Sequence, residues 1–432
     1  METSLRKNLT PYFRNKLVKQ KFIPGKTLVP VSGKVFDEEE LINGVEAVLD
    51  GWWTEGRFAQ EFEKQFREYL GVRYVSLVNS GSSANLVALS ALTSSVFGER
   101  ALKPGDEVIT AATAFPTTVN PIIQNRLTPV FIDNDLGTKN ATVDGIKKAI
   151  SNKTRAIMMA HTLGNPMPLD GIMELVKKHN LWFIEDCCDA LGSTYSGKMA
   201  GTFGHVATFS FYPAHMITMG EGGAVITQHP LIHRAIRQLR DWGRDCWCDT
   251  GKDNTCGKRF GWKLGDLPFG YDHKYIYSQI GYNVKLTDMQ AAIGLAQLKK
   301  LPQFITKRKE NYQRLLKGLK RYEKYFLFTE IEKEADPCWF GFTIVVRDGA
   351  PFSKLELVKY LEDKKIATRS LFAGNLLKHP AYISRKDIRV IGKLSNSDKI
   401  MNDGFWIGVY PGITKEMIAY VCKTFDDYFK NY

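Results

Sequence analysis

Residues 210–223 read Ser-Phe-Tyr-Pro-Ala-His-Met-Ile-Thr-Met-Gly-Glu-Gly-Gly and follow several short apolar runs typical of strands. The stretch ends in a glycine-rich turn, and its serine and histidine, Ser210 and His215, stand five residues apart. Histidine has an ordinary pKa of about 6.5 and can move a proton near neutral pH. A lone loop histidine more often has no special role, so the interpretation of His215 depends on the surrounding sequence.

The surrounding chain, from about residue 73, alternates short apolar runs with segments of helical periodicity. This alternation predicts an α/β fold built on a sheet. Strands are expected at residues 74–78, 107–110, 127–133, 155–161, 181–186 and 224–227.

A turn at residues 79–85, Asn-Ser-Gly-Ser-Ser-Ala-Asn, joins the first of these strands to a helix. A glycine- and serine-rich turn at a helix N-terminus presents free backbone N–H groups and the positive end of the helix dipole, which suits a phosphate. Such turns are also common connectors, so this signal alone is weak.

Residues 181–186, Leu-Trp-Phe-Ile-Glu-Asp, have the pattern of a buried strand that ends in a carboxylate. Open α/β sheets place their chemistry at the carboxyl ends of strands, so Asp186 is a candidate site residue. If the strand alternation continues past Asp186, the side chain of Cys188 faces the same side.

A polar, glycine- and lysine-rich insertion at 241–275 is long for a compact domain, and we expect it to be functional or mobile. It contains Cys246, Cys248 and Cys256, and the intervals from Cys188 onward are 57, 1 and 7 residues. No generic zinc-finger or ferredoxin spacing fits, so spacing alone leaves a metal site and scattered buried thiols equally open. Burial as small hydrophobic residues, however, poorly explains three cysteines in a polar insertion.

The composition excludes some classes of protein. The length of 432 residues favours two domains, and 44% hydrophobic with 24% charged residues is ordinary for a globular protein. No run of 18 apolar residues predicts a membrane span, and the N-terminus lacks a secretory signal, so we expect a cytoplasmic protein without membrane contact. The net charge of +13 is scattered and no nucleic-acid motif is present; a basic surface suits an anionic nucleotide substrate or an acidic protein partner.

The stretch 210–223 resembles the lysine loop of the sugar-nucleotide aminotransferases, the DegT/DnrJ/EryC1/StrS family of pyridoxal phosphate (PLP) enzymes. In that family a serine, here Ser210, precedes the cofactor-binding lysine by five residues. His215 replaces the lysine, and an imidazole cannot form a comparable stable bond with the cofactor aldehyde. The resemblance implies PLP-dependent transferase fold type I: a large domain with a mixed, mostly parallel sheet and a smaller C-terminal α+β domain.

The resemblance also implies roles for individual residues and a homodimer. The cofactor phosphate is expected at Ser210 and at the turn 79–85, and the pyridine ring is expected to stack on Phe115. The ring nitrogen is expected beside Asp186, whose carboxylate keeps this nitrogen protonated. Asp189 stands where aminotransferases carry Gln or His near the phenolic oxygen, and Asn283 matches an asparagine that reaches the neighbouring subunit's cofactor phosphate. The expected contacts of the cofactor are therefore Gly81, Ser82, Ser83, Phe115, Asp186, Asp189, Ser210 and Asn283.

The cysteine intervals resemble the [2Fe–2S] motif of the CDP-6-deoxy-4-keto-glucose 3-dehydrases, which also carry histidine in place of the lysine. The implied ligands are Cys188, Cys246, Cys248 and Cys256. The implied reaction uses pyridoxamine phosphate (PMP) and the cluster to remove the C3 hydroxyl of a CDP-linked 4-keto-6-deoxyhexose, with His215 as the base. Its product leads to 3,6-dideoxysugars of lipopolysaccharide O-antigen, and its electrons come from an NADH-dependent flavin iron–sulfur reductase.

Two alternatives remain open. One is a PMP-dependent nucleotide-sugar 3-dehydratase without a cluster, and the other is a non-catalytic, redox-responsive relative. The expected domain organisation is an N-terminal arm at 1–30, a large cofactor-binding domain at 31–300 with the insertion 241–275, and a small C-terminal domain at 301–432.

Overall fold

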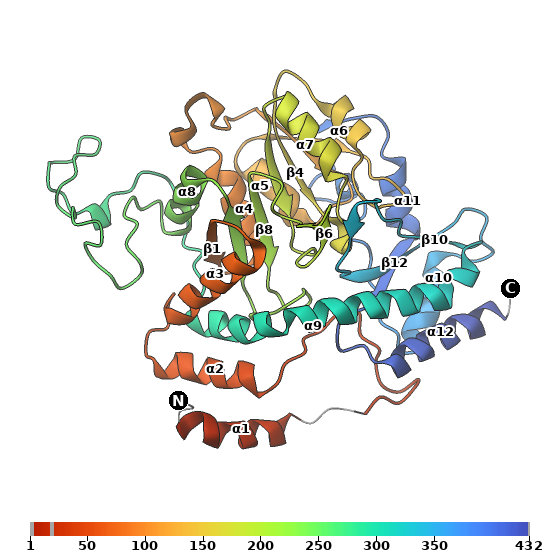
Figure 1. The fold of residues 1–432 in the computed structure, drawn as a ribbon. Coiled ribbons are helices and arrows are strands. Elements are labelled where there is room, and N and C mark those ends of the chain that lie inside the picture. Colours follow the sequence, from red (N-terminus) through yellow and green to blue (C-terminus); the bar gives the residue numbers. More distant parts are fainter. Residues whose placement is uncertain (1–3, 18–20, 431–432) are drawn as a thin grey trace.

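An eight-stranded sheet forms the centre of the structure, a computed structural model that describes residues 4–17 and 21–430 (Figure 1). The strands follow in the order β1–β9–β8–β5–β4–β2–β3–β13. Their bounds are β1 (Tyr74–Val78), β2 (Glu107–Ala111), β3 (Thr128–Ile132), β4 (Thr154–Ala160), β5 (Trp182–Asp186), β8 (Val206–Ser210), β9 (Gly223–Thr227) and β13 (Arg389–Val390). β9 is antiparallel to both neighbours, and the other adjacent strands are parallel. The predicted α/β fold with a mixed, mostly parallel sheet is confirmed.

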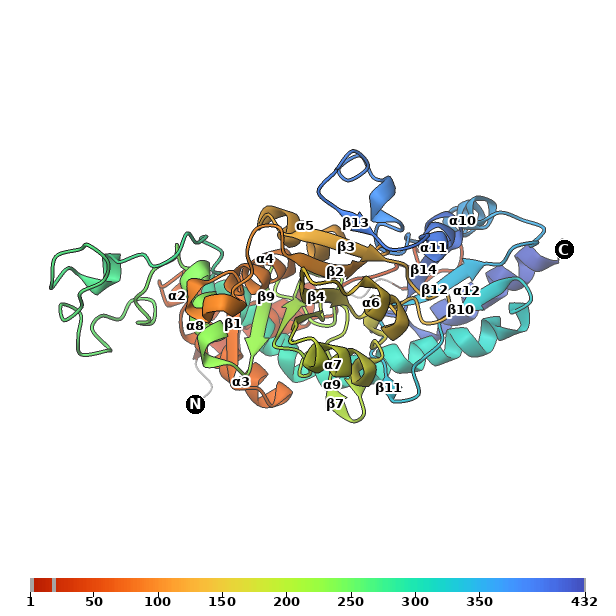
Figure 2. The same ribbon diagram turned by 90° about the horizontal axis from the view of Figure 1, so that it is seen from above.

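Helices cover both faces of this sheet (Figures 1 and 2). They are α3 (Arg57–Leu70), α4 (Gly81–Ala91), α5 (Pro116–Gln124), α6 (Val143–Ala149), α7 (Leu169–Lys178) and α8 (Pro230–Arg240). Successive residues of β5 face opposite sides: Ile184 packs with α4 and α8, whereas Phe183 packs with α6 and α7. Burial on both faces explains why the strands read as continuous apolar runs.

The long helix α9 (Asp288–Leu319) joins the large sheet to the C-terminal part of the chain (Figure 1). Its N-terminus has a capping box formed by Thr287 and Gln290, and its first half packs against α2 and α3. The helix runs without interruption through residue 300, where the sequence predicted a domain boundary. The proposed division therefore falls within one helix and stays a prediction.

The C-terminal part is built on a second, antiparallel sheet. Its elements are β10 (Phe326–Phe328), β12 (Gly341–Val346), β14 (Gly404–Gly408), α10 (Lys354–Asp363), α11 (Ser395–Asp403) and α12 (Lys415–Phe429). A third, small sheet consists of β6 (Thr194–Tyr195), β7 (Lys198–Met199) and β11 (Ala335–Asp336). The C-terminal sheet and its helices form a hydrophobic core of their own.

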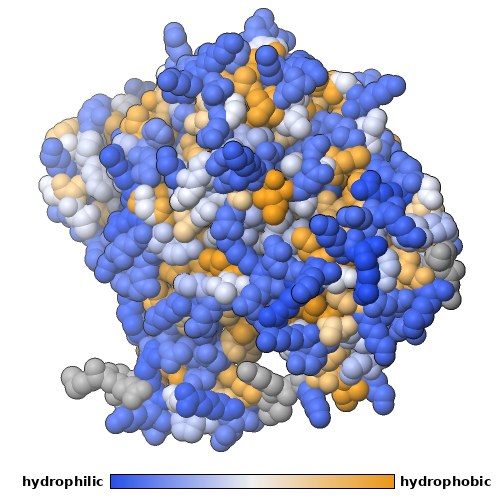
Figure 3. All heavy atoms as spheres, turned by 45° about the vertical axis from the view of Figure 1, so that its right-hand side comes forward, coloured by the Kyte–Doolittle hydropathy of each residue, from blue (hydrophilic) through white to orange (hydrophobic). Residues whose placement is uncertain are grey.

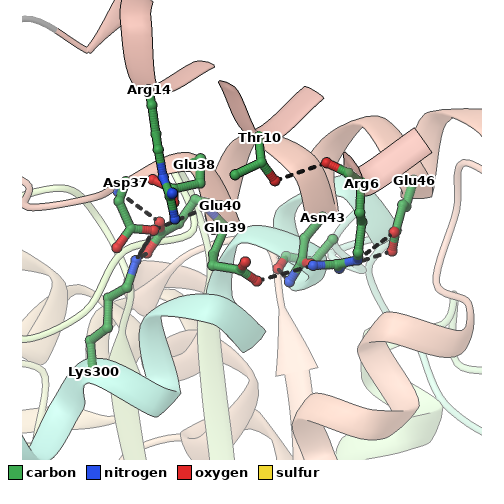
Figure 4. Close-up of polar contacts among 11 residues, drawn as sticks. Arg6, Thr10, Arg14, Asp37, Glu38, Glu39, Glu40, Asn43, Glu46 and Lys300 are labelled. Atoms are coloured by element: carbon green, nitrogen blue, oxygen red, sulfur yellow. Dashed lines mark hydrogen bonds and ion pairs between the residues drawn. The ribbon is translucent and has the colours of Figure 1, made fainter. Parts of the chain in front are cut away.

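The N-terminal helix α1 (Ser4–Lys16) lies on α2 (Glu38–Leu49), as Figure 4 shows in close-up. Arg6 donates to the carboxylate of Glu46 at 2.8 Å and to the side-chain oxygen of Asn43 at 2.6 Å. On the opposite side of α2, Lys300 of α9 binds Glu40. Part of the predicted N-terminal arm is therefore a helix held by ion pairs to α2.

The insertion predicted at 241–275 leaves the end of α8 and extends away from the sheet in both ribbon views (Figures 1 and 2). Among its described residues the regular structure is one 3₁₀ turn, η3 (His273–Tyr275). Asp245 fastens the base of the insertion to α8, because it accepts hydrogen bonds from Arg234 at 2.9 Å and Gln238 at 2.7 Å.

The face shown in Figure 3 is mostly hydrophilic, with hydrophobic residues in small separate patches. No described helix combines the length and apolar character needed to cross a lipid bilayer.

Candidate active site

The N-terminus of α4 forms a cup together with the end of β8. Ser80 caps the helix, and its hydroxyl oxygen accepts the backbone N–H of Ser83 at 3.0 Å. A Cβ atom at Gly81 would lie 2.5 Å from the Cβ of Ser210 and 3.0 Å from the Sγ of Cys188. The structure therefore brings the predicted turn and Ser210 together, with Cys188 beside them. The predicted phosphate contacts stay a prediction.

The tight contact at Gly81 gives a testable prediction. Gly81→Ala should displace Ser210, lower stability by about 1–3 kcal/mol and weaken phosphate-dependent cofactor binding. Thermal unfolding and PMP titration measure the two effects. Gly44→Ala in α2 is the matched control, because its nearest side-chain atom would lie 4.0 Å away. Unchanged melting temperature and affinity in Gly81→Ala would contradict the tight cup.

Asp186, at the end of β5, is a buried carboxylate held only by neutral donors. Its Oδ2 accepts from Asn85 at 2.8 Å and from Thr118 at 2.7 Å, and its Oδ1 accepts the N–H of Cys188 at 3.1 Å. Thr208 fixes Asn85 by donating to its Oδ1 at 2.6 Å. Among the described residues Asp186 has no ion-pair partner. A buried, oriented carboxylate without a cation suits a ligand that brings a positive charge, such as a protonated ring nitrogen.

His215 lies beside the second buried carboxylate of the site, that of Asp189. The His215 Nδ1 and the Asp189 Oδ1 are 3.2 Å apart, although not aligned as a hydrogen bond. Burial raises the pKa of Asp189, and the neighbouring His215 opposes that rise. The His215 backbone is fixed by its N–H to Tyr212 and by Arg308, which donates to its carbonyl oxygen at 2.9 Å. With Nδ1 facing Asp189, Nε2 is the nitrogen available for proton transfer.

Three predicted site residues lie at the open side of the cup or outside it. Phe115 is 51% exposed, so one face of its ring is available to a ligand, and Tyr212 is equally exposed. Ser82, in the first turn of α4, is also exposed. Asn283 is exposed and its side-chain oxygen accepts from Lys285 at 3.3 Å. Its predicted reach into a neighbouring subunit stays a prediction.

Three of the four predicted cluster ligands lie together in the insertion. Cys246, Cys248 and Cys256 line one small pocket, whose wall also contains Arg259 and Lys274. We call these three cysteines the thiol trio.

Hydrogen bonds reach two of the three sulfurs of the trio, whereas burial raises the pKa of the third, Cys246, above its ordinary value. Thr255 donates to the Sγ of Cys248 at 3.0 Å, and the N–H of Lys258 donates to the Sγ of Cys256 at 3.4 Å. Burial acts to raise the pKa of Cys248, but hydrogen bonds led by that from Thr255 outweigh it and lower the pKa. Soft thiolates with N–H and O–H donors and nearby cations fit part of the ligand shell of an anionic iron–sulfur cluster.

The fourth predicted ligand, Cys188, lies elsewhere. It is in the cup against Gly81 and Ser210 and is not among the residues lining the pocket of the trio. Burial and the charge of Asp186 raise the pKa of Cys188 well above its ordinary value. Strand β5 ends at Asp186, so the alternation does not continue to Cys188; Cys188 lies beside Asp186 because it opens the turn that follows, and the set of four ligands stays a prediction.

The sequence did not reveal the residues that orient the two carboxylates. Asn85 is the last residue of the turn 79–85, and Thr118 stands three residues after Phe115. A buried carboxylate at the end of a strand needs hydrogen-bond donors, so Asn85 and Thr118 were candidates for this role from the sequence. Arg308 comes from the middle of α9 and contacts the loop of His215 from 93 residues away in the chain, so no local pattern predicts it.

The chain is similar to known proteins over most of its length. A model of the DegT/DnrJ/EryC1/StrS aminotransferase family matches residues 36–426. The lipopolysaccharide biosynthesis protein RfbH of Salmonella typhimurium is 54% identical over 97% of this chain and 95% of its own. The dTDP-4-dehydro-2,6-dideoxy-D-glucose 3-dehydratase of Saccharopolyspora spinosa is 52% identical over 94% of this chain and 88% of its own.

Solved structures show the same architecture. The Escherichia coli GDP-4-keto-6-deoxy-D-mannose-3-dehydratase with bound hydrated PLP superposes with a TM-score of 0.82 and 29% sequence identity, covering 92% of this chain and 99% of that one. The expected PLP-dependent transferase fold type I is confirmed. The chain belongs to the DegT/DnrJ/EryC1/StrS aminotransferase family.

Proposed function

We propose that the protein is a nucleotide-sugar 3-dehydrase that uses PMP and a [2Fe–2S] cluster to deoxygenate a CDP-linked 4-keto-6-deoxyhexose. One observation carries the proposal: His215, which the resemblance aligns with the family lysine, lies beside the buried carboxylate of Asp189. The buried Asp186, which lacks a cation among the described residues, supports a pyridine cofactor in the same cup. The names of the relatives in Saccharopolyspora spinosa and Escherichia coli support 3-dehydration as the reaction.

The residues of the site divide the work. PMP, when bound, supplies an amine for the C4 ketone and a ring that accepts electrons, and the cluster supplies single electrons. Asp186 holds the charge of the ring nitrogen, and the α4 N-terminus with Ser210 holds the phosphate. His215 Nε2 removes a proton at C4′ of the cofactor and returns it to the departing C3 hydroxyl, while Asp189 on the Nδ1 side orients its ring.

The proposed reaction balances with a two-electron donor. The C3–O bond breaks, the oxygen leaves as water, and C3 gains a hydrogen, which together consume two electrons and two protons. NADH and one further proton supply these through a flavin iron–sulfur reductase. The product is a nucleotide-linked 4-keto-3,6-dideoxy sugar for lipopolysaccharide O-antigen, in keeping with the name of the Salmonella typhimurium relative.

The assembly and compartment are also part of the proposal. A homodimer with shared sites would place Asn283 near the partner's phosphate and cover the exposed ring of Phe115. We place the enzyme in the cytoplasm, where a reducing environment keeps its seven cysteines from forming disulfides.

A second function is favoured by one observation, the separation of Cys188 from the thiol trio. It is 3-dehydration with PMP but without a cluster. The two functions differ in what they need: the cluster-free reaction proceeds without a reductase.

Turnover with a panel of substrates tests the proposed function. The CDP-, dTDP- and GDP-linked 4-keto-6-deoxyhexoses are each incubated with enzyme, NADH and reductase. We expect the largest kcat/KM with CDP and a product lighter than the substrate by one oxygen atom. Omitting the reductase should abolish product while NADH remains unused. Product formed equally well without reductase would support the cluster-free enzyme, and a preference for dTDP or GDP would refute the assigned nucleotide.

A further inference from the structure

The thiol trio is fixed to the outside of its own chain. The pocket of the trio is lined by His273, whose Nε2 lies 2.8 Å from Oδ2 of Asp245. Asp245 in turn is bound by Arg234 and Gln238 of α8. Since the insertion also extends away from the sheet in two perpendicular views, the trio is tied to α8 rather than poised to swing freely (Figures 1 and 2).

Aromatic packing further stiffens this arrangement. The Trp262 ring stacks on His273 with centroids 4.8 Å apart, and Trp247 meets both rings edge-on at 5.7 and 5.3 Å. Arg259, which lines the pocket, forms two hydrogen bonds with Asp272 at 2.9 and 2.6 Å. These contacts hold the insertion together as one unit, so carrying the trio onto Cys188 of the same chain would require the release of the bonds between Asp245 and α8.

Cys188 is fixed in a different place. Its N–H donates to the buried Asp186, and its Sγ packs against Gly81 in the cup. Within one chain, therefore, three of the four predicted cluster ligands lie at the insertion. The fourth, Cys188, lies apart from them in the cup. A four-thiolate cluster is incomplete at both places.

Large apolar side chains are exposed near both places. Ile280, where the insertion returns to the body, is 97% exposed, and Phe269 within the insertion is 75% exposed. At the cup, the rings of Phe115 and Tyr212 are each 51% exposed. Burying these side chains against another chain would be favourable. A second copy of the chain fits best, because it alone brings the missing thiols to both places at once.

We propose that the cluster is bound between two copies of the chain, by Cys246, Cys248 and Cys256 of one subunit and by the partner's Cys188. The inference rests on the proposed function, which supplies the cluster. In a two-fold dimer the arrangement repeats, so one dimer holds two clusters, each at the cup of the subunit that contributes Cys188. Each cluster then lies beside the cofactor that it reduces, and reduction depends on the insertion of the other subunit.

Hybrid dimers test this arrangement without any activity assay. One subunit carries Cys188→Ser, the other carries Cys246→Ser with Cys256→Ser, and two different affinity tags isolate the hybrid after anaerobic coexpression. A shared cluster leaves one site with all four cysteines, so the hybrid should hold one [2Fe–2S] cluster per dimer, half the wild-type amount. Iron content, visible absorption and the electron spin resonance of the reduced protein measure it. Both parental homodimers should hold none.

The controls separate the possible outcomes. A hybrid of wild type with the Cys246→Ser, Cys256→Ser subunit should hold one cluster whether ligands are shared or not, which calibrates the assay. PMP content reports that each variant is folded. The shared site is overturned if the hybrid of the Cys188→Ser subunit with the Cys246→Ser, Cys256→Ser subunit holds no iron while the wild type binds two clusters. If all four ligands came from one chain, neither subunit of this hybrid would have a complete set. Failure of the two tagged subunits to copurify also overturns it. Wild type without iron overturns the proposed function itself.

Discussion

Replacing His215 with lysine should attach PLP covalently to the protein and end deoxygenation. The lysine amine condenses with the cofactor aldehyde, which the imidazole of the wild type cannot do. The substitution also removes the His215 imidazole, which moves the proton in the proposed reaction. Borohydride reduction followed by denaturation and mass spectrometry should show PLP fixed to the variant and released from the wild type. Net formation of the 3-deoxy product should fall below detection.

The matched control for this substitution is His215→Asn. The amide cannot serve as a base, so kcat should fall about 10²–10⁴-fold while PMP stays bound without a covalent link. Transamination need not appear in the lysine variant, because Asp189 still lies beside position 215. Normal deoxygenation by His215→Lys, or PLP fixed to a lysine in the wild type, would show that His215 is not at the position of the family lysine.

Cys256→Ser should abolish net deoxygenation while leaving the first half of the reaction intact. A serine oxygen is a harder ligand than iron in such clusters usually takes, so the cluster should be weakened or lost. In the proposed reaction, loss of the C3 hydroxyl requires PMP and His215, and the contacts of His215 with Tyr212, Arg308 and Asp189 lie outside the insertion. Substrate incubated with PMP-loaded variant in oxygen-18 water should therefore still gain label at C3, because departure and return of water are reversible.

The matched control is Cys422→Ser, in α12 of the C-terminal part. Its iron content, its oxygen-18 exchange at C3 and its rate of product formation should equal those of the wild type. If the Cys256→Ser enzyme forms product at the normal rate, the cysteines of the insertion take no part in deoxygenation, and the cluster-free dehydratase is favoured. Loss of label exchange with PMP binding and folding intact would mean that the cluster takes part in dehydration as well.

Local patterns in the sequence predicted most of the large sheet. The strand that ends at Asp186 lies where the apolar run placed it, because it is buried on both faces. The turn after β1 and Ser210 meet as expected, since both follow from strand ends at the same edge of the sheet. The boundary near residue 300 had no comparable signal, because helical periodicity continues across it in α9.

What the sequence could not supply are contacts between distant segments. The pairing of His215 with Asp189 joins two loops, and the support from Arg308 comes from α9. The cysteine spacing indicated four candidate ligands, but it did not indicate which of them lie close together in the folded chain. Only the folded chain shows a trio on the insertion and Cys188 in the cup.

The most direct measurement is the absorption spectrum of protein purified without oxygen, taken together with its iron and vitamin B6 content. We expect a near-ultraviolet band from non-covalent PMP and the broad visible bands of an oxidised [2Fe–2S] cluster, which bleach on reduction. We also expect about two iron atoms per chain, the content of one such cluster. A spectrum with PMP but neither iron nor visible bands, after anaerobic reconstitution with iron and sulfide, would contradict the account and leave a cluster-free dehydratase.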